Sequence, residues 1–339
     1  MTNLGIELAG NLVEATLRLS GPVGLANARA NLPFIKRTIL ELQPKTDEAR
    51  PSSVIVFGAG PSLHRRNPAA ALLEHGYRGE VVASDAALGF CLRHGVVPDY
   101  VLNVDPHPHR LIRWFGDPYL SSRPADDYYR RQDFDPIHRE DEAQANRLIL
   151  ELVNRHGKQI KAVIATSADP GVRQRCLDVG MELYWWNPLY DDYDAPDSYS
   201  RRAYELTGVP CMVTGGNVGT SSFVFADVIR RAREVALVGF DLGYAPGTPL
   251  LNTQRYYELV EFLGDRAAEA FIDIHNPFLG ETWMSDPTYY WYREIFFQIL
   301  AVANSRVFNC TEGGTVFGDG ITFTSLKDFL RRHPPATPK

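Results

Sequence analysis

Three short apolar runs between residues 54 and 105 constrain the fold more than any other feature of the chain. Each run leads into glycine, small or acidic residues, and a segment of helical pattern separates one run from the next: the runs are Val54–Phe57, Val81–Ala83 and Tyr100–Val104. Strands that alternate with helices predict a parallel sheet. In such an open α/β sheet, ligands bind beyond the carboxyl ends of the strands. We therefore predict a nucleotide site at this edge of the sheet, and an enzyme.

The first apolar run ends in a glycine turn that suits a phosphate group. Gly58 and Gly60 allow positive φ and a close approach of the backbone to a ligand. Pro61 suits the first position of a helix, and Ser62 can satisfy free amides there. A helix N-terminus attracts anions. The spacing matches neither G-x-G-x-x-G nor the P-loop, so a purely structural turn is the alternative.

A second turn of the same kind follows a strand predicted over 209–214. Its candidate nucleotide-binding residues are Gly215, Gly216, Asn217, Gly219, Thr220 and Ser221. The glycines permit close backbone approach, and the amide and hydroxyl groups can bind a ribose, base or phosphate. The alternative is that Thr214 or Asn217 only caps the helix that follows.

The remaining pattern predicts a Rossmann-like, doubly wound, mostly parallel sheet in three parts. We expect an N-terminal helical leader over 1–50, a nucleotide-binding core over 51–244 and a C-terminal lid or subdomain over 245–335. The sequence pattern predicts that the leader begins with a strand-like segment and continues with a helix over 27–42. The core carries an irregular surface insertion at about 118–139, and its last central strand, 236–240, ends at Asp241.

Composition narrows the class of protein. The chain has 339 residues, 45% of them hydrophobic, and a net charge of −6, which argues against a nucleic-acid binder. No apolar run reaches the ~18 residues of a membrane span, and the N-terminus lacks the layout of a signal peptide; we expect a cytoplasmic protein. The four cysteines are far apart and indicate neither a zinc site nor a disulfide framework, so no metal ligands are predicted.

The order of six motifs then points to a family. GAGPSL, ASD, PDYVLNVDP, TGGNVGTSS, VALVGFDLGY and NCTEGG follow one another between residues 50 and 320. This order resembles the family that joins motility accessory factor (Maf) proteins to MptE-like 6-hydroxymethylpterin diphosphokinases. The two glycine turns also resemble those of bacterial sialyltransferases that use CMP-sugars. The TEGG motif and the aromatic block WMSDPTYYWYREIFFQIL favour the Maf branch.

The resemblance implies a sialyltransferase-type core with the nucleotide at the carboxyl ends of the strands. Both glycine turns match nucleotide loops, and Asp85 falls where the sialyltransferases use a polar residue. It further implies a glycosyltransferase that moves a nonulosonic or related keto-sugar from a CMP-activated donor to a glycan or protein acceptor. No cofactor is required for that reaction, because helix amides and tyrosine hydroxyls can stabilise the leaving nucleotide. Tyr256 and Tyr257 are candidates for that role, with simple helix packing as the alternative.

The acceptor hydroxyl needs a base that titrates near the working pH. The related sialyltransferases carry a histidine after the strand that matches 235–240, and His275 is the nearest candidate here, although IDIHNPF gives no match at the level of a motif. A structural histidine is the alternative. Asp241 and Asp105 are the further catalytic candidates.

Two other functions stay open. In a magnesium-dependent, MptE-like diphosphokinase, ATP would bind with Mg²⁺ held by Asp85, Asp105 or Asp241, and a pterin hydroxyl would attack the β-phosphate. The chain could also be a non-catalytic nucleotide-binding protein. The sequence leaves open the donor sugar, the nucleotide base, the acceptor and whether the chain forms a homo-oligomer.

Overall fold

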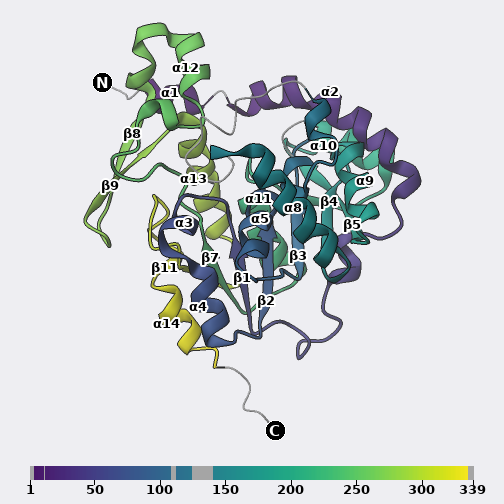
Figure 1. Cartoon of the computed structure of the whole chain (residues 1–339). Helices are drawn as coiled ribbons and strands as arrows, with labels where there is room; N and C mark the ends of the chain where they lie inside the picture. The colour runs from purple at the N-terminus through teal and green to yellow at the C-terminus, as the bar shows by residue number, and fades with distance from the viewer. Residues whose placement is uncertain (1–3, 11, 108–111, 124–139, 335–339) are drawn as a thin grey trace.

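The computed structural model describes residues 4–10, 12–107, 112–123 and 140–334. Within these ranges, nine strands form one parallel sheet in the order β11-β10-β7-β1-β2-β3-β4-β5-β6 (Figure 1). The strands are β1 (Ser53–Phe57), β2 (Glu80–Ser84), β3 (Tyr100–Asn103), β4 (Lys161–Ala165), β5 (Glu182–Leu189), β6 (Cys211–Val213), β7 (Glu234–Val238), β10 (Arg306–Asn309) and β11 (Ile321–Phe323). The prediction of a doubly wound, Rossmann-like α/β fold is confirmed.

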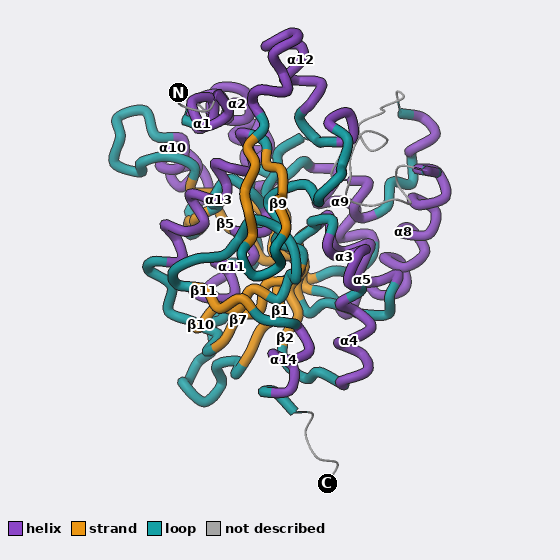
Figure 2. Tube along the Cα trace, turned by 90° about the vertical axis from the view of Figure 1, so that its left-hand side faces the viewer, coloured by secondary structure: helices purple, strands orange, loops and turns teal. Residues whose placement is uncertain are grey.

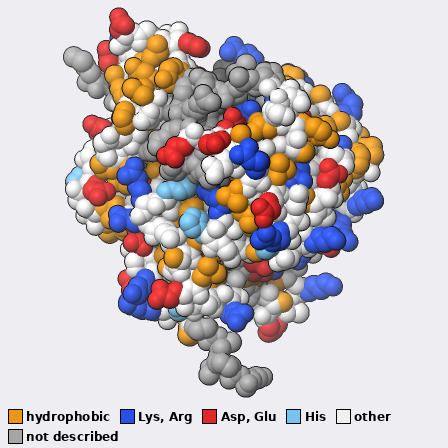
Figure 3. Space-filling view, viewed as in Figure 1, with side chains coloured by type: hydrophobic (Ala, Val, Ile, Leu, Met, Phe, Trp, Pro, Cys, Tyr) orange, Lys and Arg blue, Asp and Glu red, His pale blue; other side chains and the backbone are white. Residues whose placement is uncertain are grey.

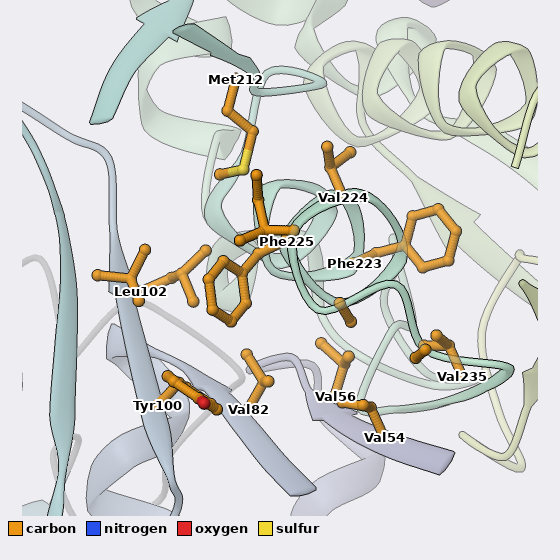
Figure 4. Close-up of a cluster of buried hydrophobic side chains, with 14 of the residues drawn as sticks. Val54, Val56, Val82, Tyr100, Leu102, Met212, Phe223, Val224, Phe225 and Val235 are labelled. Atoms are coloured by element: carbon orange, nitrogen blue, oxygen red, sulfur yellow. The ribbon is translucent and has the colours of Figure 1, made fainter. Parts of the chain in front are cut away.

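Helices cover both faces of this sheet, because its central strands are apolar on both sides. Val54 and Val56 of β1 face one cluster of buried side chains, while Ile55 and Phe57 face another. Against the first face pack α11 (Val218–Val224), the π-helical turn η7 (Phe225–Ile229) that continues it, and α13 (Pro287–Leu300) (Figure 4). Against the second lie α3 (Ser62–Arg66), α4 (Pro68–His75), α5 (Asp85–Arg93), α8 (Glu142–His156), α9 (Pro170–Asp178) and α14 (Leu326–Arg331).

The direction of chain crossing reverses between β1 and β7. From β1 the chain continues to β2 on one side, whereas from β7 it continues to β10 on the other. Ligands in open α/β sheets bind at such a switch point, outside the carboxyl ends of the strands. The loops after β1 and β7 meet here, since the amide of Gly58 donates to the carbonyl of Val238 at 2.8 Å.

The N-terminal leader is helical, but its helix lies earlier than predicted. Helices α1 (Leu4–Ala9) and α2 (Leu12–Asn31) replace the expected strand-like start, and the helix predicted over 27–42 is wrong. Helix α2 ends at Asn31, because Pro33 lacks the backbone N–H that would continue the α-helical hydrogen bonds. Residue Thr38 then pairs with Trp185 of β5. Within the predicted range, residues 27–31 belong to the end of α2, and only the short 3₁₀ turns η1 (Leu32–Phe34) and η2 (Ile39–Leu42) follow.

Residues 256–285 form an outlying layer. It holds α12 (Tyr256–Leu263) and a separate antiparallel hairpin of β8 (Ile272–Asn276) and β9 (Glu281–Ser285), which stands apart from the main sheet (Figure 2). Hydrophobic side chains gather on the surface over α12 (Figure 3), where Phe262 is 73% exposed. The division of the chain at residues 50 and 244 stays a prediction, and residues 124–139 of the expected insertion lie outside the described ranges.

The remaining described helices are short, apart from α10 (Tyr199–Thr207) at the β6 side of the sheet. They are the 3₁₀ turns η1 (Leu32–Phe34), η3 (Ile112–Phe115), η4 (Leu120–Ser122), η6 (Gly157–Gln159), η8 (Leu250–Asn252) and η9 (Gly264–Ala270). Among the described residues, no helix is both long enough and apolar enough to cross a membrane.

Candidate functional site

The predicted loops lie along one edge of the sheet. Because the nine strands are parallel, the residues that follow each strand share the carboxyl edge. The first glycine turn follows β1, Asp85 follows β2, Asp105 follows β3, the second glycine turn follows β6 and Asp241 follows β7. The arrangement needed for a nucleotide site at this edge is therefore present, although residues 108–111 after Asp105 lie outside the described ranges.

The first glycine turn is filled by the protein's own carboxylate. Ser62 donates to Asp241 through a short hydroxyl hydrogen bond and through its backbone amide at 3.3 Å. The amide of Gly60 donates to the carbonyl of Gly239 at 2.9 Å. Burial raises the pKa of Asp241 to about 7, against the lowering effect of these bonds. The amides predicted to hold phosphate thus already have partners.

Two glycines make room for the Asp241 carboxyl group. A Cβ atom on Gly60 would lie 2.0 Å from Oδ2 of Asp241, and one on Gly313 would lie 3.0 Å from Oδ1. The positive φ expected at Gly58 and Gly60 is absent, and both are glycine because neighbouring atoms leave no space for a side chain. Pro61 is the N-cap of α3 rather than its first helical residue.

The second glycine turn caps its own helix, which was the alternative interpretation. Asn217 accepts from the amide of Thr220 at 2.9 Å, and its side-chain nitrogen donates to the hydroxyl of Thr220 at 3.0 Å. Ser221 donates to the carbonyl of Thr214 at 3.1 Å. Gly215 and Gly216 do have positive φ, 59° and 82°, so this turn depends on glycine for its backbone conformation.

Aromatic side chains of α13 close over this second turn. A Cβ atom on Gly216 would lie 2.2 Å from the ring of Trp291 and 2.6 Å from that of Tyr292. A Cβ atom on Gly219 would lie 3.5 Å from the ring of Phe240 at the end of β7. The aromatic block that favoured the Maf branch in the sequence therefore packs directly on the predicted nucleotide loop.

A buried polar network lies where β2 and β3 end. The Asp85 carboxylate accepts from the amide of Ala86 at 2.8 Å and from Nδ2 of Asn103 at 3.0 Å. Oγ of Ser84 and Oδ1 of Asn103 are buried without a hydrogen-bond partner among the described residues. Buried polar atoms are normally paired, so these two atoms are candidates for contact with a ligand. Neither residue was predicted from the sequence, although each is the last residue of its strand.

Asp85 has a carboxyl group that titrates near neutral pH. Burial raises the pKa of Asp85 to about 7, the hydrogen bonds from Asn103 and Ala86 oppose the rise, and the nearby charge of Asp105 adds to it. Asp105 itself is exposed and accepts from the amide of His107 at 2.8 Å. The structure thus brings together two of the predicted acids, one buried and one open to solvent.

Helix α2 covers the same edge over β3 and β4. Asn27 donates to the carbonyls of Pro106 and Ser167, both at 2.9 Å, which ties the loop that carries Asp105 to the loop after β4. Tyr190, directly after β5, packs against Tyr199 with tilted rings whose centres are 5.5 Å apart. Burial and the neighbouring Tyr199 and Asp105 raise the pKa of Tyr190. Tyr190 was not predicted from the sequence, although it directly follows an apolar strand.

Three predicted residues are not brought to this network. His275 is exposed on β8, with Thr282 across the hairpin as its hydrogen-bond partner at 3.4 Å, while the next residue, Asn276, points inward and donates to Gly314. Because side chains alternate along a strand, His275 faces the opposite way. Tyr256 and Tyr257 contact each other edge to face in α12, a helix without a buried side chain. The base and the leaving-group tyrosines predicted from the sequence thus lie on the hairpin and on α12 and not in the network of Asp85 and Asn103.

No group of three or more His, Cys, Asp or Glu side chains that could hold a metal ion occurs within residues 4–10, 12–107, 112–123 and 140–334. Mg²⁺ commonly uses only one or two carboxylates together with substrate phosphates. The neighbouring carboxylates of Asp85 and Asp105 have the chemistry for that mode of binding.

Comparisons with known proteins confirm the resemblance seen in the motifs. Residues 26–113 match a family model described as 6-hydroxymethylpterin diphosphokinase MptE-like. The solved structure of the Maf glycosyltransferase from Magnetospirillum magneticum AMB-1 is similar with a TM-score of 0.56 and 16% sequence identity, over 90% of this chain and 38% of that one. This chain thus spans well under half the length of that glycosyltransferase, and the likeness establishes a shared fold. No curated protein sequence matches the chain significantly.

The packing around Asp241 predicts a structural cost for any side chain at position 60. We expect Gly60→Ala to lower the free energy of unfolding by about 2–4 kcal/mol, because its Cβ atom would displace the Asp241 carboxyl group. Urea unfolding measures this change. Gly10→Ala is the matched control, since its Cβ atom would lie 3.6 Å from the carbonyl oxygen of Glu7, an ordinary van der Waals contact. An equal and small effect of the two substitutions would contradict this packing.

The raised pKa of Asp85 predicts a pH-dependent stability. The folded-state pKa of about 7 exceeds the ordinary value of 3.8, so the contribution of Asp85 to stability is complete below about pH 4 and is lost as pH rises through 7. Asp85→Asn removes this titration and keeps a side-chain oxygen that can accept from Nδ2 of Asn103. We expect the variant to gain about 1–3 kcal/mol relative to the unmodified chain between pH 5 and pH 8. Urea unfolding at both pH values tests this, and a pH-independent difference would show that Asp85 is ionised throughout.

Proposed function

We propose that this chain is a glycosyltransferase that uses a nucleotide-activated sugar, with the nucleotide held at the carboxyl edge beside Asp85 and Asn103. The observation that carries the proposal is the buried network in which Ser84 and Asn103 keep unpartnered oxygen atoms. It lies at the ligand-binding edge of a fold shared with a Maf glycosyltransferase. The donor that we propose is a CMP-activated nonulosonic or related keto-sugar, and the acceptor is a glycan or a protein.

The network suits the ribose of a nucleotide. In dinucleotide-binding folds, an acidic residue about 20 residues after the glycine turn accepts from the ribose hydroxyls. Asp85 follows the Gly58–Ser62 turn at about this spacing in the sequence. Its carboxylate, the carbonyl oxygen of Asn103 and the nearby Asp105 are hydrogen-bond acceptors, so the group that completes the network must bring donors. Two adjacent sugar hydroxyls do so.

The phosphate contacts at the glycine turns are also proposals. For the first turn, a phosphate would have to replace the Asp241 carboxylate as the acceptor from Ser62. For the second turn, the phosphate would contact the backbone of Gly215 and Gly216, beside the rings of Trp291 and Tyr292. Tyr190, which lies close to Asp105, takes the place of Tyr256 and Tyr257 as the proposed donor of a hydrogen bond to the leaving phosphate.

Transfer then requires one bond to form and one to break. The oxygen of the acceptor hydroxyl attacks the anomeric carbon of the sugar, and the bond from that carbon to the phosphate oxygen breaks, so that CMP leaves with the bonding electron pair. The hydroxyl proton passes to a base. We assign this role to Asp105, because its carboxylate is exposed to an incoming acceptor and lies beside Asp85.

The match to the pterin diphosphokinase family supports a second candidate function. It covers β1, β2 and β3, the part of the chain that carries Asp85 and Asp105. In that reaction Mg²⁺ bound by these two acids would neutralise the phosphates of ATP. The pterin hydroxyl would attack the β-phosphorus, and AMP would leave. A non-catalytic nucleotide-binding protein is the third candidate, with the same network as its binding site.

A thermal-shift screen of CMP, CDP, UDP, GDP, ADP and ATP, each with and without Mg²⁺, separates these functions. Ligands that bind the folded state raise its melting temperature by mass action. We expect CMP to stabilise the chain without Mg²⁺, and Asn103→Leu to abolish that stabilisation because it removes the carbonyl acceptor. Stabilisation by ATP alone, and only with Mg²⁺, would favour the diphosphokinase. Absence of any shift would contradict nucleotide binding in all three functions.

Turnover of two variants distinguishes Asp105 from His275 as the base. Asp105→Asn should lower the release of CMP from a CMP-activated keto-sugar by ~10²–10⁴-fold while the dissociation constant of CMP changes little, as expected for loss of a general base. His275→Ala should leave turnover within about threefold, because the imidazole faces solvent on the hairpin. The reverse result would restore the prediction made from the sequence and would require the hairpin to move.

A further inference from the structure

The TEGG motif builds a small cavity that the proposed function does not use. The cavity has a volume of about 70 Å³ and lies between the ends of β7 and β10 and the helices α3, α4 and α14. Its lining residues are Ser62, Arg66, Pro68, Ala71, Val238, Cys310, Thr311, Glu312, Leu326 and Lys327. A space of this size admits a small organic molecule or several waters.

The inner wall of the cavity is largely apolar. Pro68, Val238, Cys310 and Leu326 are buried lining residues. Burial raises the pKa of Cys310, so its thiol stays uncharged and counts as part of this wall. Ser62 and Thr311 are the buried polar lining residues, and the hydroxyl of Ser62 already donates to Asp241. The hydroxyl oxygen of Thr311 accepts from the amide of Phe240 at 3.0 Å, which leaves its hydrogen to be donated to a ligand.

The mouth of the cavity is positively charged. Arg66 and Lys327 are both exposed, and they come from α3 and α14 on opposite sides. Nε of Arg66 donates to the carbonyl of Glu312 at 3.1 Å, which fixes the guanidinium and leaves its terminal nitrogens for a ligand. The carboxylate of Glu312 is half-buried and accepts from the amide of Leu326 at 3.1 Å. Together, the side chains of Arg66, Lys327 and Glu312 give the mouth of the cavity a net charge of one positive unit.

The backbone conformation of Glu312 allows this residue to contact both α3 and α14 at the mouth of the cavity. Its φ of 55° lies in the left-handed region, which is uncommon for a residue other than glycine. This turn lets one residue bind Arg66 of α3 through its carbonyl and the start of α14 through its carboxylate. Strained backbone of this kind is maintained only where the surroundings impose it and is often found at ligand sites.

We propose that this cavity is a second binding site, which takes a small monocarboxylate of about three or four carbon atoms. The carboxylate would lie between Arg66 and Lys327, with the hydroxyl of Thr311 as a further donor, and the short alkyl body would fill the apolar wall. A phosphate dianion fits poorly, because it has no apolar part and would lie beside the carboxylate of Glu312. The cavity shares Ser62 with the first glycine turn, but the ligand contacts proposed here come from Arg66, Lys327 and Thr311, which have no role in the nucleotide site proposed above.

Ligand-observed NMR and thermal shift with propionate and butyrate test this site, with sodium chloride of equal ionic strength as the reference. We expect saturable binding to the full chain. Arg66→Gln and Lys327→Gln should each weaken it by about tenfold, since each removes a charge-assisted contact. Ala71→Leu should abolish it by filling the cavity. Arg331→Gln is the matched control, because Arg331 also belongs to α14 but pairs with Asp328 on the surface and does not line the cavity.

Urea unfolding of each variant establishes that loss of binding is not loss of fold. The proposal is overturned if neither carboxylate binds at about 100 mM, far above a Kd of ~1 mM. It is equally overturned if folded Arg66→Gln/Lys327→Gln double variants bind propionate as well as the unmodified chain. Binding of inorganic phosphate without binding of either carboxylate would show that the apolar wall does not select the ligand, and would also overturn it.

Discussion

The buried contact between Asp241 and Ser62 is the constraint around which the carboxyl edge is built. It joins the end of β7 to the start of α3 across the switch point of the sheet. The backbone of Gly314 and Thr315 closes on the same residue, with the amide of Thr315 donating to the carbonyl of Asp241 at 2.8 Å. A carboxyl group in so confined a space has a raised pKa, because it loses the hydration that favours its charged form. Three chain segments are thus held together through one residue, Asp241, by its side chain and its backbone.

This contact separates the edge into regions with different chemistry. On the β2 and β3 side lies the network of Asp85 and Asn103, with unpartnered oxygen atoms and an exposed acid, Asp105, beside it. On the other side of Ser62 lies the cavity with Arg66 and Lys327 at its mouth. The first region offers acceptors to a ligand and the second offers donors. A nucleotide sugar and a small carboxylate are complementary to these two regions respectively.

Much of the fold follows from local patterns in the sequence, whereas side-chain direction does not. The apolar runs that became β1, β2 and β3 and the acids that follow them were predicted correctly, because a parallel strand buried on both faces needs a continuous apolar run. The leader helix was misplaced because apolar periodicity continues past Pro33. His275 was chosen by its position after the last central strand, but the pairing of β8 with β9 turns it to solvent.

The sequence by itself determined the class of fold, the edge of the sheet that carries the polar residues, and the resemblance to Maf and MptE-like proteins. These properties follow from the order of strands, glycines and acids along the chain, which is a local signal. Only the tertiary structure decided what each polar group contacts: that Asp241 fills the first turn, that Asn217 caps α11, and that Asn103 meets Asp85. The physical reason is that these partners, apart from those of Asn217, come from different strands. Their pairing is fixed by sheet order and by the burial of polar atoms, neither of which a single segment of sequence contains.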